Sequence, residues 1–174
     1  MTLEEVEALL KPLKPQSGLE ESLELFKQAE MLLPKVILEI GVADGGSLLL
    51  WSKLLQEDGL LIGIDAYSLM GWDLKTTKCK TVLIIGDSRG EQVVEETKKT
   101  LQGREIDFLR IDGGHDYVTA KSDFDKYSPF VREGGLIAFH DYNSSVEVKR
   151  YVDDLSATHN IVRIGATDST YLFK

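Results

Sequence analysis

Apolar and polar positions alternate in blocks along most of this chain. From about residue 35 onward, short continuous apolar runs are followed by longer segments with apolar residues at helical spacing. Continuous apolar runs are typical of strands buried on both faces of a parallel sheet. The pattern predicts strands at 35–40, 60–65, 81–85, 106–112 and 134–140, and helices at 45–56, 89–101, 118–127 and 144–156.

The last part of the chain departs from this alternation. Two apolar runs, 160–164 and 171–173, are separated only by the short segment 165–169. A connection of this length joins antiparallel neighbours, as in a hairpin. We therefore predict an α/β fold with a doubly wound, seven-stranded sheet that is mostly parallel and has a terminal antiparallel strand.

The first residues predict helices without strands. Thr2 and Glu5 have the spacing of a capping box, which begins a short helix. A second amphipathic helix fits 19–32 and ends before Pro34. At 174 residues the chain is most simply one domain, so we predict an N-terminal helical segment at 1–33 and an α/β domain at 34–174.

Composition and net charge limit the classes of binding partner and the cellular location that we expect for the protein. The net charge of -9 argues against nucleic acid, because phosphate binding needs a basic surface. Cys79 is the only cysteine, so no intramolecular disulfide can form. No apolar run reaches the ~18 residues of a membrane-spanning helix, and the acidic N-terminus has no signal-like segment. We expect a cytoplasmic protein with no membrane partner.

Acidic residues lie at or just after the carboxyl ends of the five predicted strands of the parallel part of the sheet. Each alone is explained by a turn or a helix cap. Ligands of open α/β sheets, however, bind beyond the carboxyl ends of the strands, where all five acids would gather. The sequence therefore predicts a site formed by Glu39, Asp65, Asp87, Asp112 and the pair His140-Asp141.

The glycine-rich turn after the first of these strands has an unusual spacing. It runs from Glu39 through Gly41 and Gly45 to Ser47, as E-x-G-x-x-x-G-x-S. A dinucleotide-binding turn would need a further glycine at position 43, and the carboxylate of Glu39 would repel a pyrophosphate. That carboxylate instead suits a cationic ligand with an amino group. Asp65 can accept both hydroxyls of a ribose.

These motifs resemble those of class I S-adenosylmethionine-dependent methyltransferases, and within that class methyltransferase family 24, which is related to O-methyltransferases. The resemblance extends over about residues 34–174 and implies a Rossmann-like fold. It rests on the sequences LEIGVADGGS at 38–47, GID at 63–65, IDGGH at 111–115, DF at 123–124, YSP at 127–129 and GGLIAFHDY at 134–142.

The resemblance implies a reaction and a cofactor. The chain would transfer a methyl group from S-adenosylmethionine to a hydroxyl of a small molecule. The turn after Glu39 would hold the methionine part, Asp65 the ribose, and Asp87 with Ser88 would lie beside the adenine. The implied cofactor-binding residues are Glu39, Gly41, Val42, Gly45, Ser47, Asp65, Ala66, Asp87, Ser88 and Asp112.

Related enzymes hold a divalent cation, Mg²⁺ or Mn²⁺, at positions that correspond here to Asp112, His140 and Asp141. His140 departs from that pattern, since the relatives usually carry a carboxylate, and imidazole favours softer ions. Alternatively, His115 or His140 acts as general base without a metal. Asp112, His115 and His140 are therefore the catalytic candidates. A third interpretation is that His140 only fixes its loop by a hydrogen bond.

Two further features stay open. Arg110 lies within a buried apolar strand, where a guanidinium requires a carboxylate partner. The acceptor pocket has to be shaped by residues 1–33, by the loop at 66–79 with Trp72 as a candidate lid, or by a partner subunit of a homo-oligomer. The main competing function is a catalytically inactive protein or subunit that binds S-adenosylmethionine or S-adenosylhomocysteine. An NAD-dependent oxidoreductase is a weaker alternative.

Overall fold

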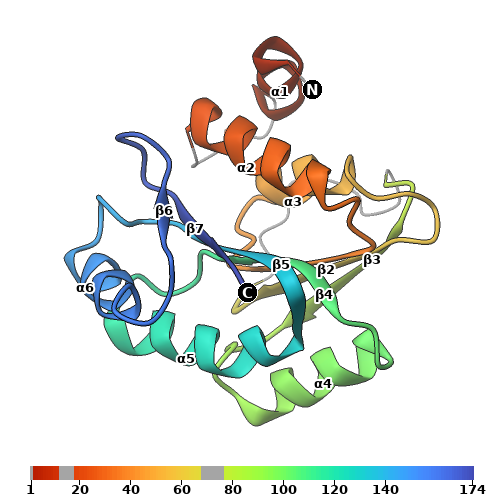
Figure 1. The fold of residues 1–174 in the computed structure, drawn as a ribbon. Helices are drawn as coiled ribbons and strands as arrows, with labels where there is room; N and C mark the ends of the chain where they lie inside the picture. The colour runs from red at the N-terminus through yellow and green to blue at the C-terminus, as the bar shows by residue number, and fades with distance from the viewer. Residues whose placement is uncertain (1, 12–17, 68–76) are drawn as a thin grey trace.

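The protein is a three-layer α/β structure with one sheet between two groups of helices (Figure 1). The computed structural model describes residues 2–11, 18–67 and 77–174. The strands are β1 (Val36–Ile40), β2 (Leu60–Asp65), β3 (Lys80–Ile85), β4 (Ile106–Ile111), β5 (Val131–Phe139), β6 (Val162–Arg163) and β7 (Thr170–Phe173). The helices are α1 (Leu3–Leu10), α2 (Leu19–Met31), α3 (Gly46–Ser52), α4 (Glu91–Leu101), α5 (Tyr117–Tyr127), the 3₁₀ turn η3 (Ser128–Phe130) and α6 (Val146–Leu155).

The strand order confirms the predicted fold class. The sheet has seven strands in the order β3-β2-β1-β4-β5-β7-β6, and β1 to β5 pair in parallel. The final strand β7 pairs antiparallel with both β5 and β6. It therefore lies inside the sheet, and the two-residue β6 forms the edge. The burial of the strands agrees with this placement, because Thr170 to Leu172 of β7 are buried whereas the two residues of β6 are half-buried and exposed, and a short edge strand limits unwanted pairing.

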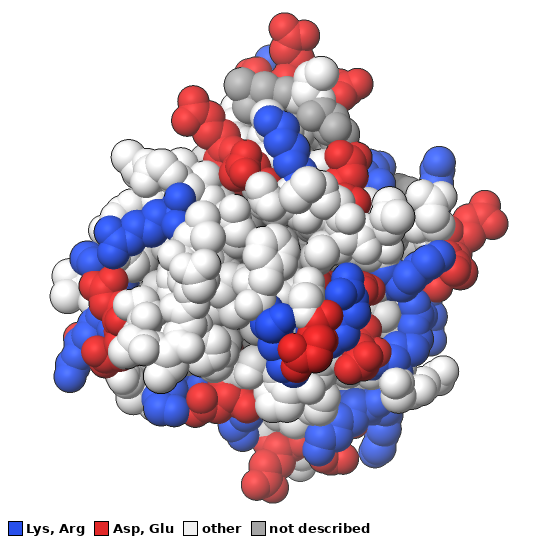
Figure 2. Space-filling model, viewed as in Figure 1, with Lys and Arg blue, Asp and Glu red and all other residues white. Residues whose placement is uncertain are grey.

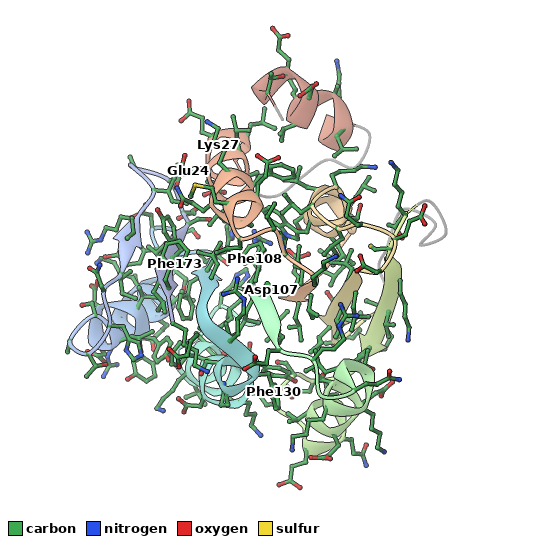
Figure 3. All side chains as sticks on the ribbon, turned by 45° about the vertical axis from the view of Figure 1, so that its right-hand side comes forward. Glu24, Lys27, Asp107, Phe108, Phe130 and Phe173 are labelled. Carbon is green, nitrogen blue, oxygen red and sulfur yellow. The ribbon has the colours of Figure 1, made fainter. Side chains whose placement is uncertain are left out.

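Two apolar cores flank the sheet, one on each face. On one face α2 and α3 pack over the sheet and α1 packs against these two helices, and Phe108 and Trp51 meet edge to face in this core. On the other face α4, α5 and α6 enclose a second core, against which Phe130 packs. Figure 3 shows Phe108 on the side of α2 and Phe130 on the side of α5. Every residue of β1 is buried, as expected for a strand covered on both faces.

Helix caps place several loops at the carboxyl edge of the sheet. Asp116 caps α5 by accepting a hydrogen bond from the backbone N of Thr119 at 2.9 Å. Gly45, with φ +81°, is the left-handed N-cap of α3, so the glycine-rich turn ends directly on a helix N-terminus. At the other end of the chain, Thr2 and Glu5 form the predicted capping box.

On the face drawn in Figure 2, Lys and Arg side chains lie next to Asp and Glu side chains. Among the residues that the structure describes, no helix combines the length and apolar character needed to cross a bilayer.

Candidate active site

A cavity of about 720 Å³ opens at the carboxyl ends of β1 to β4. Its position is the one that strand polarity predicts for a ligand site. A smaller recess beside it is lined by Asp112, His115, His140 and Asp141. The predicted residues that line the main cavity are Gly41, Asp65, Ala66, Asp87, Ser88, Asp112 and His115.

The glycine-rich turn is held close to two neighbouring strands. Gly41 has φ +85°, and a Cβ atom there would lie 1.8 Å from the carbonyl oxygen of Asp112, so only glycine fits. The backbone N atoms of Val42 and Ala43 donate to Oδ2 of Asp65 at 2.8 and 2.9 Å. Oδ1 of Asp65 accepts from the backbone N of Tyr67 at 2.8 Å. Asp65 thus fastens the turn to the end of β2.

Glu39 lies outside the cavity lining. It is 0% exposed, and its Oε1 accepts from Nη1 of Arg110 at 2.5 Å and from the indole N of Trp51 at 3.2 Å. Nη1 of Arg110 also lies 2.6 Å from Oδ2 of Asp112. Burial raises the pKa of Glu39, although the charge of Arg110 opposes that rise. Arg110 thus has the carboxylate partners that its burial requires. Three other predicted cofactor residues, Val42, Gly45 and Ser47, also lie outside the cavity lining.

Two side chains of α5 form hydrogen bonds with Ser88. Its hydroxyl donates to Oδ1 of Asp123 at 2.6 Å, and the hydroxyl of Tyr127 donates to its carbonyl oxygen at 2.7 Å. Asp123 is fully buried, and burial raises its pKa to about 6 against the hydrogen bond from Ser88. Sequence reasoning did not assign Asp123 a role. Its place on the buried face of α5, three residues after Ala120 and four before Tyr127, was the signal that could have found it.

His140, at the end of β5, is surrounded by carboxylates. Its Nδ1 lies 3.1 Å from Oδ1 of Asp112 and 3.3 Å from Oδ2 of Asp141, and its Nε2 lies 3.1 Å from Oε1 of Glu21. Burial alone would lower the pKa of His140, but these three hydrogen bonds raise it to about 11. Burial alone would raise the pKa of Asp141, but its hydrogen bonds with His140 and Ser144 lower that pKa to about 2. Both ring nitrogens of His140 therefore act as donors.

His115 is the more accessible histidine of the site. Its side chain is 61% exposed, and its Nε2 lies 3.1 Å from Oδ2 of Asp141. Ligand atoms of Asp112, His115 and Asp141 all lie within 4.8 Å of one another. The structure also brings the predicted Asp112, His140 and Asp141 together, but the set that offers ligand atoms for an ion has His115 in place of His140. The reason is that both nitrogens of His140 already face carboxylates.

Comparison with known proteins identifies the family. A family described as a methyltransferase domain, methyltransferase family 24, matches residues 38–142, which include the glycine-rich turn and both His/Asp motifs. The chain belongs to this methyltransferase family. A curated relative, the uncharacterized protein R132 of Acanthamoeba polyphaga mimivirus, is 33% identical over 114 residues, which cover 60% of this chain and 50% of R132.

Solved methyltransferase structures share the fold of this methyltransferase. MycE of the mycinamycin biosynthetic pathway, in complex with Mg and S-adenosylhomocysteine, is 19% identical with a TM-score of 0.69, covering 99% of this chain and 54% of MycE. The O-methyltransferase NovP is 18% identical with a TM-score of 0.68, and the match covers 90% of this chain and 80% of NovP. An O-methyltransferase from Bacillus cereus, in complex with S-adenosylhomocysteine, is 15% identical with a TM-score of 0.64. The match covers 99% of this chain and 90% of the Bacillus cereus enzyme. The Rossmann-like class I fold is confirmed, and the chain spans about half the length of R132 and MycE.

Besides Asp123, sequence reasoning missed a second residue of the methyltransferase site. Glu21, in α2, is 2% exposed and accepts hydrogen bonds from His140 and from the backbone N atoms of Gly18 and Asp168. Gly18 is close to Glu21 in sequence and explains it only as a helix cap, whereas His140 and Asp168 come from distant segments, so the sequence around Glu21 does not mark it as a site residue. Trp72, the predicted lid, lies outside the described residues.

Proposed function

We propose that this methyltransferase transfers the methyl group of S-adenosylmethionine to a hydroxyl of a small molecule. The observation that carries the proposal is the shared cavity. It joins the strand-end carboxylates of Asp65 and Asp112 with the exposed imidazole of His115. Fold alone does not determine an acceptor, so the proposal depends on these side chains.

The cavity suits the cofactor in several respects. Because Gly41 has no side chain, its backbone lies directly against that of Asp112. This packing leaves room at the centre of the site, where the methionine part would lie. Asp65 uses its oxygens on backbone amides, yet a carboxylate has about four acceptor sites and can also receive ribose hydroxyls. Asp87 and Ser88 line the next part of the cavity, where the adenine would lie. The structures of MycE and of the Bacillus cereus enzyme contain S-adenosylhomocysteine, which supports S-adenosylmethionine as the cofactor.

In the proposed reaction, the acceptor oxygen forms a bond to the methyl carbon while the bond from that carbon to sulfur breaks. The hydroxyl proton must leave, and a base at hydrogen-bond distance can accept it. His115 is suited to this role, because a hydrogen on Nε2 that is donated to Asp141 leaves Nδ1 with a free lone pair. His140 offers no such lone pair, since both its nitrogens donate to carboxylates.

The same residues suit a divalent cation. Asp112, His115 and Asp141 would hold it, and their mixture of carboxylate and imidazole favours Mn²⁺ over Mg²⁺. When bound, the cation would lower the pKa of the acceptor hydroxyl and orient it. A structure of MycE is a complex with Mg, which supports a divalent cation in this methyltransferase. His115 is then a ligand, and without the cation it is the base.

A second candidate function is binding of S-adenosylmethionine or S-adenosylhomocysteine without catalysis. One observation favours it. Asp112 and Asp141 are already joined by His140, and Asp112 is also paired with Arg110. Such pairing would give these acids a structural task even in an inactive subunit.

Calorimetry with S-adenosylhomocysteine, with NAD as the negative control, tests the cofactor. Failure of S-adenosylhomocysteine to bind would refute the whole proposal. Transfer of a labelled methyl group to a panel of small hydroxylated compounds then separates the enzyme from the inactive binding protein. His115→Gln should abolish transfer while S-adenosylhomocysteine still binds. Titration of this variant with Mn²⁺ separates the two roles of His115, because loss of the ion identifies a ligand and retention of the ion a base.

A further inference from the structure

We propose that Glu21 of α2 is a positioning residue of the active site, which holds the ring of His140 and through it the carboxylates of Asp112 and Asp141. Helix α2 would then help to position the active site in addition to covering the sheet. The inference rests on the proposed function, because it assigns those two carboxylates to the acceptor end of the site.

Glu21 is held at three points. Its Oε1 accepts from the backbone N of Gly18 at 2.7 Å and lies 3.1 Å from Nε2 of His140. Its Oε2 accepts from the backbone N of Asp168 at 3.0 Å. The carboxylate therefore joins the start of α2, the loop before β7 and the end of β5. With an exposed fraction of 2%, it has almost no contact with solvent that could replace these partners.

His140 carries this constraint to the reaction centre. Nδ1 of the ring lies within 3.3 Å of an oxygen of Asp112, after β4, and of Asp141, after β5. Two neighbouring carboxylates repel each other unless a donor or cation lies between them. Glu21 occupies the opposite ring nitrogen, so the ring cannot flip without breaking that contact. Glu21 thus determines which side of the ring faces the two acids.

A purely structural role for Glu21 makes a different prediction. Glu21 belongs to the capping arrangement at the start of α2, so its loss could simply loosen the helix. Loosening would lower the melting temperature and weaken every ligand together. A positioning role affects the acceptor end selectively, because the main cavity, with Gly41, Asp65 and Ser88, is lined by no residue of α2.

The test compares Glu21→Ala with Glu24→Ala in the full chain. Glu24 lies one turn further along α2 and contacts Gln28 (2.9 Å) outside the site; Figure 3 labels it. We expect Glu21→Ala to weaken Mn²⁺ binding, measured by electron paramagnetic resonance, by about tenfold, as for other residues that orient ligands. The affinity for S-adenosylhomocysteine should change by less than about twofold. Glu24→Ala should change neither, and Glu21→Gln, which keeps an acceptor for Nε2, should recover part of the loss.

His140→Gln guards against a variant that fails to fold. It leaves Glu21 and α2 in place but removes the ring that connects Glu21 to Asp112 and Asp141. It should therefore reproduce the loss of Mn²⁺ affinity. The double variant Glu21→Ala/His140→Gln should lose no more than His140→Gln alone. Additive losses, or equal weakening of S-adenosylhomocysteine and Mn²⁺ in Glu21→Ala, would overturn the proposal.

A measurement without any ligand separates this inference from the proposed function. In the wild-type protein, ¹⁵N spectra of the His140 ring should show an Nε2 hydrogen that is protected from exchange with water. Glu21→Ala should remove that protection, and Glu24→Ala should keep it. If the wild-type protein binds no Mn²⁺, the cation part of the proposed function fails, while the ring signals still decide the role of Glu21. Unchanged ring signals in Glu21→Ala would overturn the inference even if both ligands bind.

Discussion

Nη1 of Arg110 lies 2.5 Å from Oε1 of Glu39, and the two side chains are 2% and 0% exposed. They stand opposite each other on the neighbouring strands β4 and β1, where Glu39 pairs in register with Arg110. Arg110 also contacts Asp112, so one guanidinium links the end of β1 to a candidate catalytic carboxylate. A buried ion pair of this kind is costly to break, because the remaining charge has no partner.

Arg110→Met should therefore destabilise the protein by about 3–5 kcal/mol, measured as the free energy of unfolding in urea. The cause is the unpaired carboxylate of Glu39. The double variant Arg110→Met/Glu39→Gln should recover much of this loss, because no buried charge at position 39 is left. Arg163→Met is the control, since its exposed pair with Asp153 should contribute less than about 1 kcal/mol. Equal effects of the two arginine variants would contradict this interpretation.

Gly41→Ala should prevent S-adenosylhomocysteine binding and lower the melting temperature. The new Cβ would lie 1.8 Å from the carbonyl oxygen of Asp112, so the turn or the end of β4 must move. Gly103→Ala is a matched control. Gly103 has a similar φ of +81°, but a Cβ added there would meet nothing within 4 Å, so only the backbone strain of about 1 kcal/mol remains. Calorimetry and thermal unfolding of both variants distinguish collision from strain.

Much of the fold could be predicted from local patterns. Apolar runs and helical spacing identified the strands and helices, and the short segment 165–169 indicated the antiparallel hairpin. The pattern did not show that β7 lies between β5 and β6, because a hairpin defines the pairing of its own strands but not which of them joins the sheet.

Site residues could be predicted from the sequence where they lie at or just after the carboxyl ends of strands. Asp65, Asp112 and His115 line the cavity for that reason. The environment of His140 was not predictable, because Glu21 lies 119 residues away in sequence and belongs to a helix whose apolar face alone was informative. The burial of Glu39 was missed for a similar reason. Arg110 was expected to need a carboxylate, but the identity of its partner depends on the register of two strands.

Asp65→Ala should weaken S-adenosylhomocysteine binding by about 100-fold or more, because a hydrogen bond to a carboxylate contributes about 1.5–3 kcal/mol and two ribose hydroxyls would be lost. It should also release the backbone amides of Val42 and Ala43 and lower the melting temperature. The control is Asp44→Ala, which removes an exposed carboxylate from the same turn. A similar loss of affinity in both variants would mean that the overall charge of the turn, and not the position of Asp65, determines binding.

Asp123 should make the stability of the protein depend on pH. Burial raises its pKa from the ordinary value of 3.8 to about 6, beside the charged groups of Asp87, Arg89 and Asp116. Because the folded state binds the proton more tightly, this group's contribution to stability is complete below about pH 4 and is lost as the pH rises through about 6. A shift of about two units corresponds to about 3 kcal/mol at most.

Asp123→Asn isolates this contribution, because an amide keeps an acceptor for the hydroxyl of Ser88 and carries no charge. Its free energy of unfolding relative to wild type should be more favourable at pH 7.5 than at pH 4.5 by about 2 kcal/mol, measured in urea at both pH values. Asp125→Asn, on the exposed side of α5 beside Lys121, is the control and should not show this gain at the higher pH. A difference between Asp123→Asn and wild type that is the same at both pH values would mean that the Asp123 carboxyl is already ionised at pH 4.5.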